Sequence, residues 1–148
     1  MIARVGHDPQ HGLAQDIYEG LAGFRLAMRR FLSFSEAALA EAGVTSRQYQ
    51  ALLVVRTTAG RQIMIRDLAG QMLMHHNGAV QLVDRLCAAR LTERIPSAED
   101  KRSVLISLTS KGEQVLESLA RIHVEGMLAN EPLLAESLSR LRHVAELA

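Results

Sequence analysis

The stretch from Ile65 to Thr109 constrains the fold of this 148-residue chain more than any other segment. Apolar residues recur three or four positions apart in LAGQM and again in GAVQLVDRL, which predicts a short helix, a turn and a second helix. Two alternating runs follow, Thr92 to Pro96 and Val104 to Leu108, and the polar segment SAEDKR between them is typical of a two-stranded hairpin. This order of elements is that of a winged helix-turn-helix.

Composition favours a mainly helical protein with one core. Hydrophobic residues make up 48% of the chain, whereas aromatic residues make up only 3% and tryptophan is absent, which favours aliphatic helix packing over a β-sandwich or barrel. The sequence has one cysteine, no apolar run long enough to cross a bilayer and no secretory signal pattern. We therefore expect a cytoplasmic protein with no membrane partner.

Capping signals predict where other helices begin and end. Thr45 followed by Gln48 fits a capping box, in which a hydroxyl and an amide satisfy free backbone donors. Ser110 with Glu113 fits a second capping box, which opens a helix that we expect Pro132 to end. A last helix is predicted to follow the proline.

The two ends of the chain are predicted to pair two copies of it. Apolar stripes at helical spacing run from about Leu13 to Ala42 and again after Ser110, and the middle region is too short to cover them. The fold class is therefore mainly α, a winged helix-turn-helix at 45–109 with long N- and C-terminal dimerisation helices at 12–42 and 110–148. The alternative is that both ends fold back on each other within a monomer.

The formal net charge of +1 is neutral evidence about a nucleic-acid partner. Counterion release depends on local phosphate contacts and not on the charge of the whole chain. The positions of the cations, and not their total, therefore indicate whether the chain binds nucleic acid.

In LAGQM, LVDRL and AEDKRSVLISLTSKG the sequence resembles the multiple-antibiotic-resistance-regulator (MarR) family of bacterial transcription factors. The most specific part is Asp100-x-Arg102, followed by an apolar strand and Leu-Thr-x-x-Gly. The resemblance implies a homodimer that binds duplex DNA, usually as a repressor, and often releases it when a small aromatic or phenolic effector enters a cleft between the dimerisation helices and the winged region. The sequence departs from the family at Leu73, where the turn usually has glycine, and at 77–79, where a Ser-Thr-Val-like run is usual. These departures bear on the operator sequence and leave the fold intact.

Seven side chains are expected to contact DNA. Asn77 and Gln81 are four positions apart on one helix face, and each amide can bond bidentately with an adenine edge. The alternative is that both are solvated helix residues. Arg102 at the hairpin tip can enter a minor groove, where the negative potential favours a guanidinium. The remaining candidates complete the set, with His75, His76 and Lys101 expected on phosphates and Arg85 on the outward face of the same helix.

Two acidic residues are expected to position the wing. Asp84 on a DNA-facing helix would repel phosphate unless it is neutralised, so we expect it to pair with Arg85, Arg102 or another wing cation. Asp100 is the acidic residue of the motif that the resemblance places in the wing.

An effector cleft is the remaining candidate site. The resemblance places it near the first two helices, where an apolar pocket with one cation would hold an anionic aromatic molecule. The alternative is that this stripe of aromatic residues and methionine is helix core. The candidates are Phe24, Arg25, Met28, Phe31 and Tyr49.

The sequence shows no motif for catalysis, a metal or a cofactor. His75 and His76 lack a third ligand at a recognisable spacing, and the other histidines form no HxxH or HExxH pattern. Cys87 lies among inward-facing apolar residues, so we expect an unreactive core thiol. We expect a protein that is not an enzyme. A winged-helix protein-interaction module without DNA binding, and a small enzyme, are the weaker alternatives.

Overall fold

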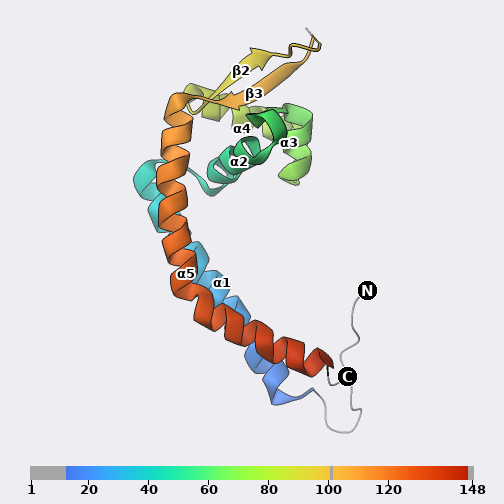
Figure 1. Ribbon diagram of the computed structural model, residues 1–148, viewed down its shortest axis with the longest axis vertical. Helices are drawn as coiled ribbons and strands as arrows, with labels where there is room; N and C mark the ends of the chain where they lie inside the picture. The colour runs from blue at the N-terminus through green and yellow to red at the C-terminus, as the bar shows by residue number, and fades with distance from the viewer. Residues whose placement is uncertain (1–12, 101, 147–148) are drawn as a thin grey trace. The chain divides into compact units, whose positions relative to one another are not determined.

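The computed structural model describes residues 13–100 and 102–146. The chain forms two compact units, which we call unit 1 (residues 1–35 and 123–148) and unit 2 (residues 36–122). Two long helices, α1 (Gln15–Ala42) and α5 (Ser110–Glu146), contribute to both units (Figure 1).

Unit 2 holds the helix-turn-helix and the hairpin between the end of α1 and the start of α5. Its three strands, β1 (Gln62–Met64), β2 (Thr92–Pro96) and β3 (Val104–Leu108), form an antiparallel sheet in the order β1-β3-β2. Ile106 of the central strand lies opposite both Ile63 and Arg94. The limits of both hairpin strands are as predicted. In chain order the elements are α2 (Ser46–Thr57), the 3-10 turn η1 (Ala59–Arg61), β1 (Gln62–Met64), α3 (Ile65–Gln71), α4 (His76–Ala88), β2 (Thr92–Pro96) and β3 (Val104–Leu108).

The start of α2 carries the predicted capping box. The Thr45 side chain accepts a hydrogen bond from the Gln48 backbone N–H at 3.1 Å, and the Gln48 side chain accepts one from the Thr45 backbone N–H at 3.0 Å. Helix α1 ends just before Gly43, whose φ of 68° is one that residues with a side chain rarely adopt. Local chemistry therefore determines both ends of this connection.

An aliphatic core holds α4 and the sheet in one unit. Leu52 of α2, Leu68 of α3, Leu86 of α4 and Ile106 of β3 are completely buried. The inward face of α4 is buried as predicted, at Ala79, Leu82, Val83 and Leu86. This core fixes the outward face of α4 and the base of the hairpin relative to each other.

The glycine of the Leu-Thr-x-x-Gly motif is required by a close backbone approach. A Cβ on Gly112 would lie 2.0 Å from the carbonyl oxygen of Leu91, which leaves no room for a side chain. The backbone N–H of Thr109 donates to the same oxygen at 3.1 Å, and the N–H of Gly112 donates to the Thr109 hydroxyl at 2.9 Å. These contacts dock the start of α5 onto the loop that follows α4.

The predicted capping box at Ser110 and Glu113 is wrong, because Thr109 supplies the capping hydroxyl and Ser110 is already helical. Glu113 instead pairs with two arginines of the preceding elements, Arg56 at 3.3 Å and Arg61 at 3.8 Å. The carboxylate thus connects α5 to α2 and η1.

Unit 1 is a pair of helical segments from the two ends of the chain. The first part of α1 packs closely on the last part of α5, since a Cβ on Gly23 would lie 2.3 Å from the Ser137 hydroxyl oxygen. Arg140 bridges the same segments, with its guanidinium 2.6 Å from Glu19 and 3.3 Å from Asp16. The two ends therefore pack on each other within one chain.

Helix α5 continues through Pro132, so the prediction that this proline ends a helix is wrong. An internal proline removes one backbone donor and normally destabilises a helix. Here the helix packs on α1 around the proline, and the Asn130 side-chain amide donates to the Ala27 carbonyl of α1. These tertiary contacts hold the helical course that the local sequence does not favour.

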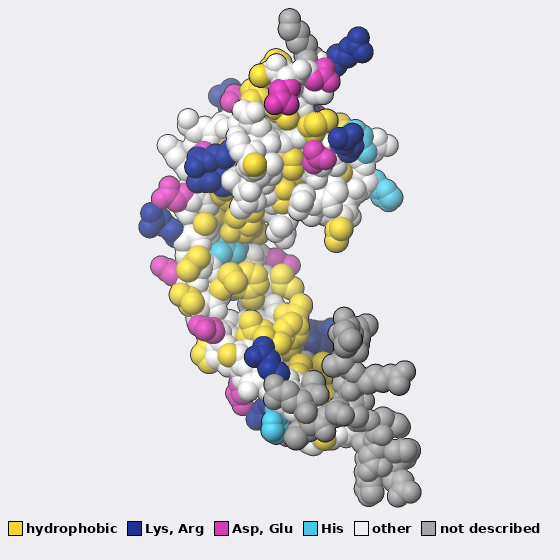
Figure 2. Space-filling view, turned by 45° about the vertical axis from the view of Figure 1, so that its right-hand side comes forward, with side chains coloured by type: hydrophobic (Ala, Val, Ile, Leu, Met, Phe, Trp, Pro, Cys, Tyr) yellow, Lys and Arg dark blue, Asp and Glu magenta, His cyan; other side chains and the backbone are white. Residues whose placement is uncertain are grey.

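Unit 1 leaves large apolar side chains exposed on both of its helical segments. On α5, Val124, Met127 and Leu128 are 54%, 56% and 61% exposed, and we call these three residues the apolar stripe. On α1, Tyr18 and Leu32 are also exposed. Figure 2 shows hydrophobic side chains gathered over the two helices of this unit. The helix pair therefore covers only part of its own apolar surface.

Candidate nucleic-acid interface

Helix α4 presents the predicted amide pair on its exposed face. Asn77 and Gln81 are both exposed, whereas the opposite face of the helix is buried in the core of unit 2. The structure therefore places these two side chains one helical turn apart on the solvent side of a fixed helix.

The turn before α4 has a leucine in a left-handed conformation. Leu73 has a φ of 53° and is 95% exposed. Its N–H donates to Gly70 at 3.3 Å, and the next N–H, that of Met74, donates to Ala69 at 2.9 Å, which is the pattern of a helix C-terminal cap. The turn keeps its geometry without the usual glycine, at a conformational cost of about 1 kcal/mol.

The first turn of α4 is open to an anion. His75 stands at the N-cap with extended backbone and makes no side-chain capping hydrogen bond, and both His75 and His76 are exposed. The positive end of the helix dipole and the free backbone donors favour a negative group at such a helix start.

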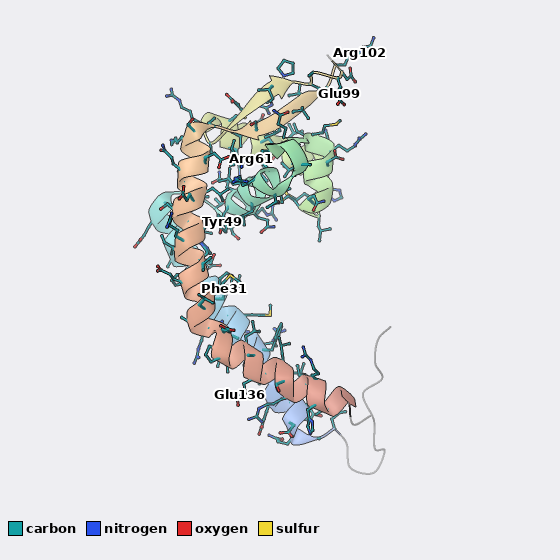
Figure 3. All side chains as sticks on the ribbon, viewed as in Figure 1. Phe31, Tyr49, Arg61, Glu99, Arg102 and Glu136 are labelled. Atoms are coloured by element: carbon teal, nitrogen blue, oxygen red, sulfur yellow. The ribbon has the colours of Figure 1, made fainter. Side chains whose placement is uncertain are left out.

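The wing tip is ordered by its own side chains. Asp100 accepts hydrogen bonds from the Arg102 backbone N–H at 2.9 Å and from the Ser103 hydroxyl at 3.1 Å, and the Ser97 N–H donates to the Ser103 carbonyl at 3.0 Å. Figure 3 shows Arg102 at the tip of the hairpin, pointing away from the helices of unit 2. The Ser97 hydroxyl, whose role the sequence did not predict, accepts hydrogen bonds from the backbone N–H groups of Glu99 at 3.3 Å and Asp100 at 3.4 Å. Lys101 lies outside the described residues.

An ion pair connects α4 to the wing. The Asp84 carboxylate pairs with the Arg94 guanidinium of β2, and both side chains are exposed. The sequence predicted a wing cation at Asp84 without identifying Arg94. Arg85, the exposed arginine of α4, makes no ion pair with any residue that the structure describes.

A polar hollow beside α4 was also missed by sequence reasoning. It has a volume of about 350 Å³ and is lined by the start of α2 and by one side of α4, including Arg47 and Arg85. The only sequence signal at the start of α2 was the capping box, which concerns helix stability and not binding.

The candidate effector residues fall in different surroundings. Met28 and Phe31 line an apolar hollow of about 130 Å³ between the α1 and α5 segments of unit 1. Phe24 is half-buried and Arg25 is exposed on the same segment of α1. Tyr49 belongs to unit 2, where it packs against the core and burial raises the pKa of its hydroxyl.

The described residues contain no group of three or more His, Cys, Asp or Glu side chains that could hold a metal ion. Cys87 is half-buried against the core, with its sulfur 3.3 Å from the Thr92 hydroxyl oxygen. A search of the same residues for a helix long and apolar enough to span a membrane finds none.

Comparisons with solved structures find this fold repeatedly. AbsC, a MarR family transcriptional regulator from Streptomyces coelicolor, is 21% identical, with a TM-score of 0.70 over 87% of this chain and 88% of AbsC. A mutant of MarR from E. coli, complexed with operator DNA, is 21% identical, with a TM-score of 0.63 over 82% and 87% of the two chains. BpsR from Bordetella bronchiseptica, whose DNA binding is regulated by 6-hydroxynicotinic acid, is 18% identical, with a TM-score of 0.63 over 83% and 88%.

Comparison with curated protein sequences finds no match. The model of the MarR family matches residues 42–103, which include the helix-turn-helix and β2 but not β3. The chain is therefore similar to the MarR family over residues 42–103, and it shares its winged helix-turn-helix fold with these solved structures.

Proposed function

We propose that the chain is a sequence-specific DNA-binding transcriptional regulator that acts as a homodimer. One observation carries the proposal: the core of unit 2 holds an outward-facing amide pair on α4 and a wing with an exposed arginine at its tip. The operator complex of a protein with the same fold supports it.

In this proposal α4 enters the major groove. Asn77 and Gln81 read base edges, and His75, His76 and Arg85 contact flanking phosphates. In the wing, Arg102 enters the minor groove and Lys101 contacts phosphate, while Asp84 and Asp100 hold the wing in place through their contacts with Arg94 and with the wing-tip turn.

The apolar stripe supports the dimer. Met127 and Leu128 lie three and four positions after Val124 on α5, all three side chains are more than half exposed, and a second copy would cover them symmetrically. Residues 12–42 and 110–148 would then join the copies, and the two 45–109 regions would read half-sites about one duplex turn apart.

We propose that the regulator is a repressor and that it leaves DNA when a small aromatic or phenolic molecule binds to it. The apolar hollow at Met28 and Phe31 supports an effector that is largely hydrophobic, with Phe24, Arg25 and Tyr49 as further candidate contacts. BpsR, whose DNA binding responds to 6-hydroxynicotinic acid, shares this fold. The regulator would act in the cytoplasm by occupying DNA.

A duplex titration at several salt concentrations tests the DNA-binding role. We expect affinity to fall steeply as salt rises, because phosphate contacts release counterions. If the chain binds no duplex, or if its affinity for duplex does not change with salt, the proposal is contradicted and a protein-interaction module is favoured.

Variants of the interface separate base reading from wing contact. Arg102→Ala should weaken binding about tenfold by removing the wing-tip cation. The double variant Asn77→Ala and Gln81→Ala should instead lose the preference for the selected duplex over random duplex, since each bidentate contact discriminates by about 1–3 kcal/mol. Unchanged affinity and preference in these variants would remove α4 and the wing from the interface.

A further inference from the structure

The polar hollow beside α4 lies within unit 2, where α2 begins. Residues from both helices line its volume of about 350 Å³. The start of α2 contributes Thr45, Ser46 and Arg47, and α4 contributes Gly78, Gln81 and Arg85.

The charged side chains that line the hollow are all positive. Arg47 and Arg85 are exposed, neither makes an ion pair with a described residue, and the lining contains no Asp or Glu. Elsewhere in unit 2, five arginines each pair with a carboxylate, namely Arg56, Arg61, Arg66, Arg94 and Arg121. Arg90 and Arg102 make no ion pair with a described residue either, but they do not line this hollow. Two guanidinium groups beside one hollow without a carboxylate create a site that favours an anion.

Neutral donors reinforce this preference. The capping box uses the backbone N–H groups of Thr45 and Gln48, so the N–H groups of Ser46 and Arg47 in the first turn of α2 have no intrahelical acceptor. Ser46, whose hydroxyl is a further neutral donor, also lines the hollow. An anion with several acceptor oxygens suits this set of donors better than a monodentate one.

We infer that the hollow binds one backbone phosphate of the duplex, held between Arg47 of α2 and Arg85 of α4. The inference rests on the proposed DNA-binding function and adds α2 as a second contacting element. Gln81 and Arg85 are one helical turn apart, so a helix that brings Gln81 to a base edge brings Arg85 toward the flanking backbone. Arg47 meets the same phosphate from the other side and fixes the rotation of α4 in the groove.

Arg47→Ala tests the site. Because a phosphate contact carries no sequence information, affinity should fall about tenfold on the selected duplex and on random duplex alike. The slope of log affinity against log salt should become shallower by about 0.9 for each protomer. Arg47→Lys, which keeps the charge but loses the guanidinium fork, should fall between the wild type and Arg47→Ala.

The matched control is Arg121→Ala, which removes the same charge from an exposed position in unit 2 that pairs with Glu117. Circular dichroism of both variants checks that they are folded. If Arg47→Ala and Arg121→Ala bind alike while the wild type binds duplex, the site is wrong and the proposed function stands. If the wild type binds no duplex, the proposed function itself fails.

A second measurement distinguishes DNA phosphate from a free anion. Inorganic phosphate is titrated at constant ionic strength while the melting temperature is followed. Stabilisation that depends on Arg47, together with duplex affinity that does not, would overturn the inference. Loss of duplex affinity on both duplexes, in Arg47→Ala only, supports it.

Discussion

The two units bury their apolar side chains very differently. In unit 2, Leu52, Leu68, Leu86 and Ile106 are completely buried in one core. In unit 1, Ala27 is completely buried, but the apolar stripe is more than half exposed. Unit 2 can therefore be stable by itself, whereas unit 1 has an incomplete core that a second copy would complete.

This difference separates two kinds of stability. The free energy of unfolding of unit 2 depends on internal packing, and it should not change with protein concentration. The stability of unit 1 should rise with protein concentration, because association stabilises only the folded helices.

The largest effect is expected for a core truncation in unit 2. Leu86→Ala removes a completely buried side chain of α4 and should lower the free energy of unfolding by about 3 kcal/mol. Urea unfolding followed by circular dichroism measures this loss. Leu128→Ala in unit 1, measured where the chain is monomeric, should change little, and an equal loss there would refute the contrast between the units.

A pair of glycine substitutions compares the tightness of packing. Gly112→Ala should cost about 3 kcal/mol, because its Cβ would lie 2.0 Å from the backbone oxygen of Leu91, which cannot move alone. Gly126→Ala in unit 1 also meets a neighbour, with its Cβ 2.2 Å from Phe34, but that ring is 38% exposed and can rotate away. It should cost about 1 kcal/mol. Thermal unfolding that ranks the two glycines in the opposite order would argue against a rigid unit 2.

Charge placed on the apolar stripe tests its role in association. Val124→Glu should raise the dimer dissociation constant at least about tenfold, because pairing would bury an uncompensated carboxylate. Sedimentation velocity measures the shift toward monomer. The control Ala129→Glu adds the same charge to an exposed position about 140° round the helix and should leave association unchanged. Association that is equally strong in both variants and the wild type excludes the stripe as the interface.

The smallest effect is expected at the turn before α4. Leu73→Gly should raise the free energy of unfolding by about 0.5–1 kcal/mol, since glycine adopts the φ of 53° without strain. Leu73→Ala removes the same exposed side chain and keeps the strained backbone, so it should give no gain. Equal melting temperatures for the glycine and alanine variants would show that the backbone is not strained there.

Local signals predicted much of the fold. The capping box at Thr45 and Gln48 and the strand limits at Thr92–Pro96 and Val104–Leu108 depend on neighbouring residues, and the structure confirms them. The end of a helix at Pro132 was predicted from the same kind of signal and is wrong, because contacts with α1 outweigh the local cost of the proline. Tertiary packing, and not the local sequence, therefore determines that α5 continues through Pro132.

The candidate site shows the same division. Helical periodicity was enough to place Asn77 and Gln81 on one exposed face of α4. The pairing of Asp84 with Arg94 and the approach of Arg47 to α4 bring together residues from different elements. No spacing in a single sequence reports such distances, so the roles of Arg94 and Arg47 emerged only from the structure.

Selection of bound duplexes from a random pool by the purified chain tests the central claim most directly, that two copies present paired reading helices to DNA. We expect the enriched sequences to contain two inverted half-sites with centres about 10 base pairs apart. A pool without enrichment, or one enriched in single unpaired half-sites, would contradict the account.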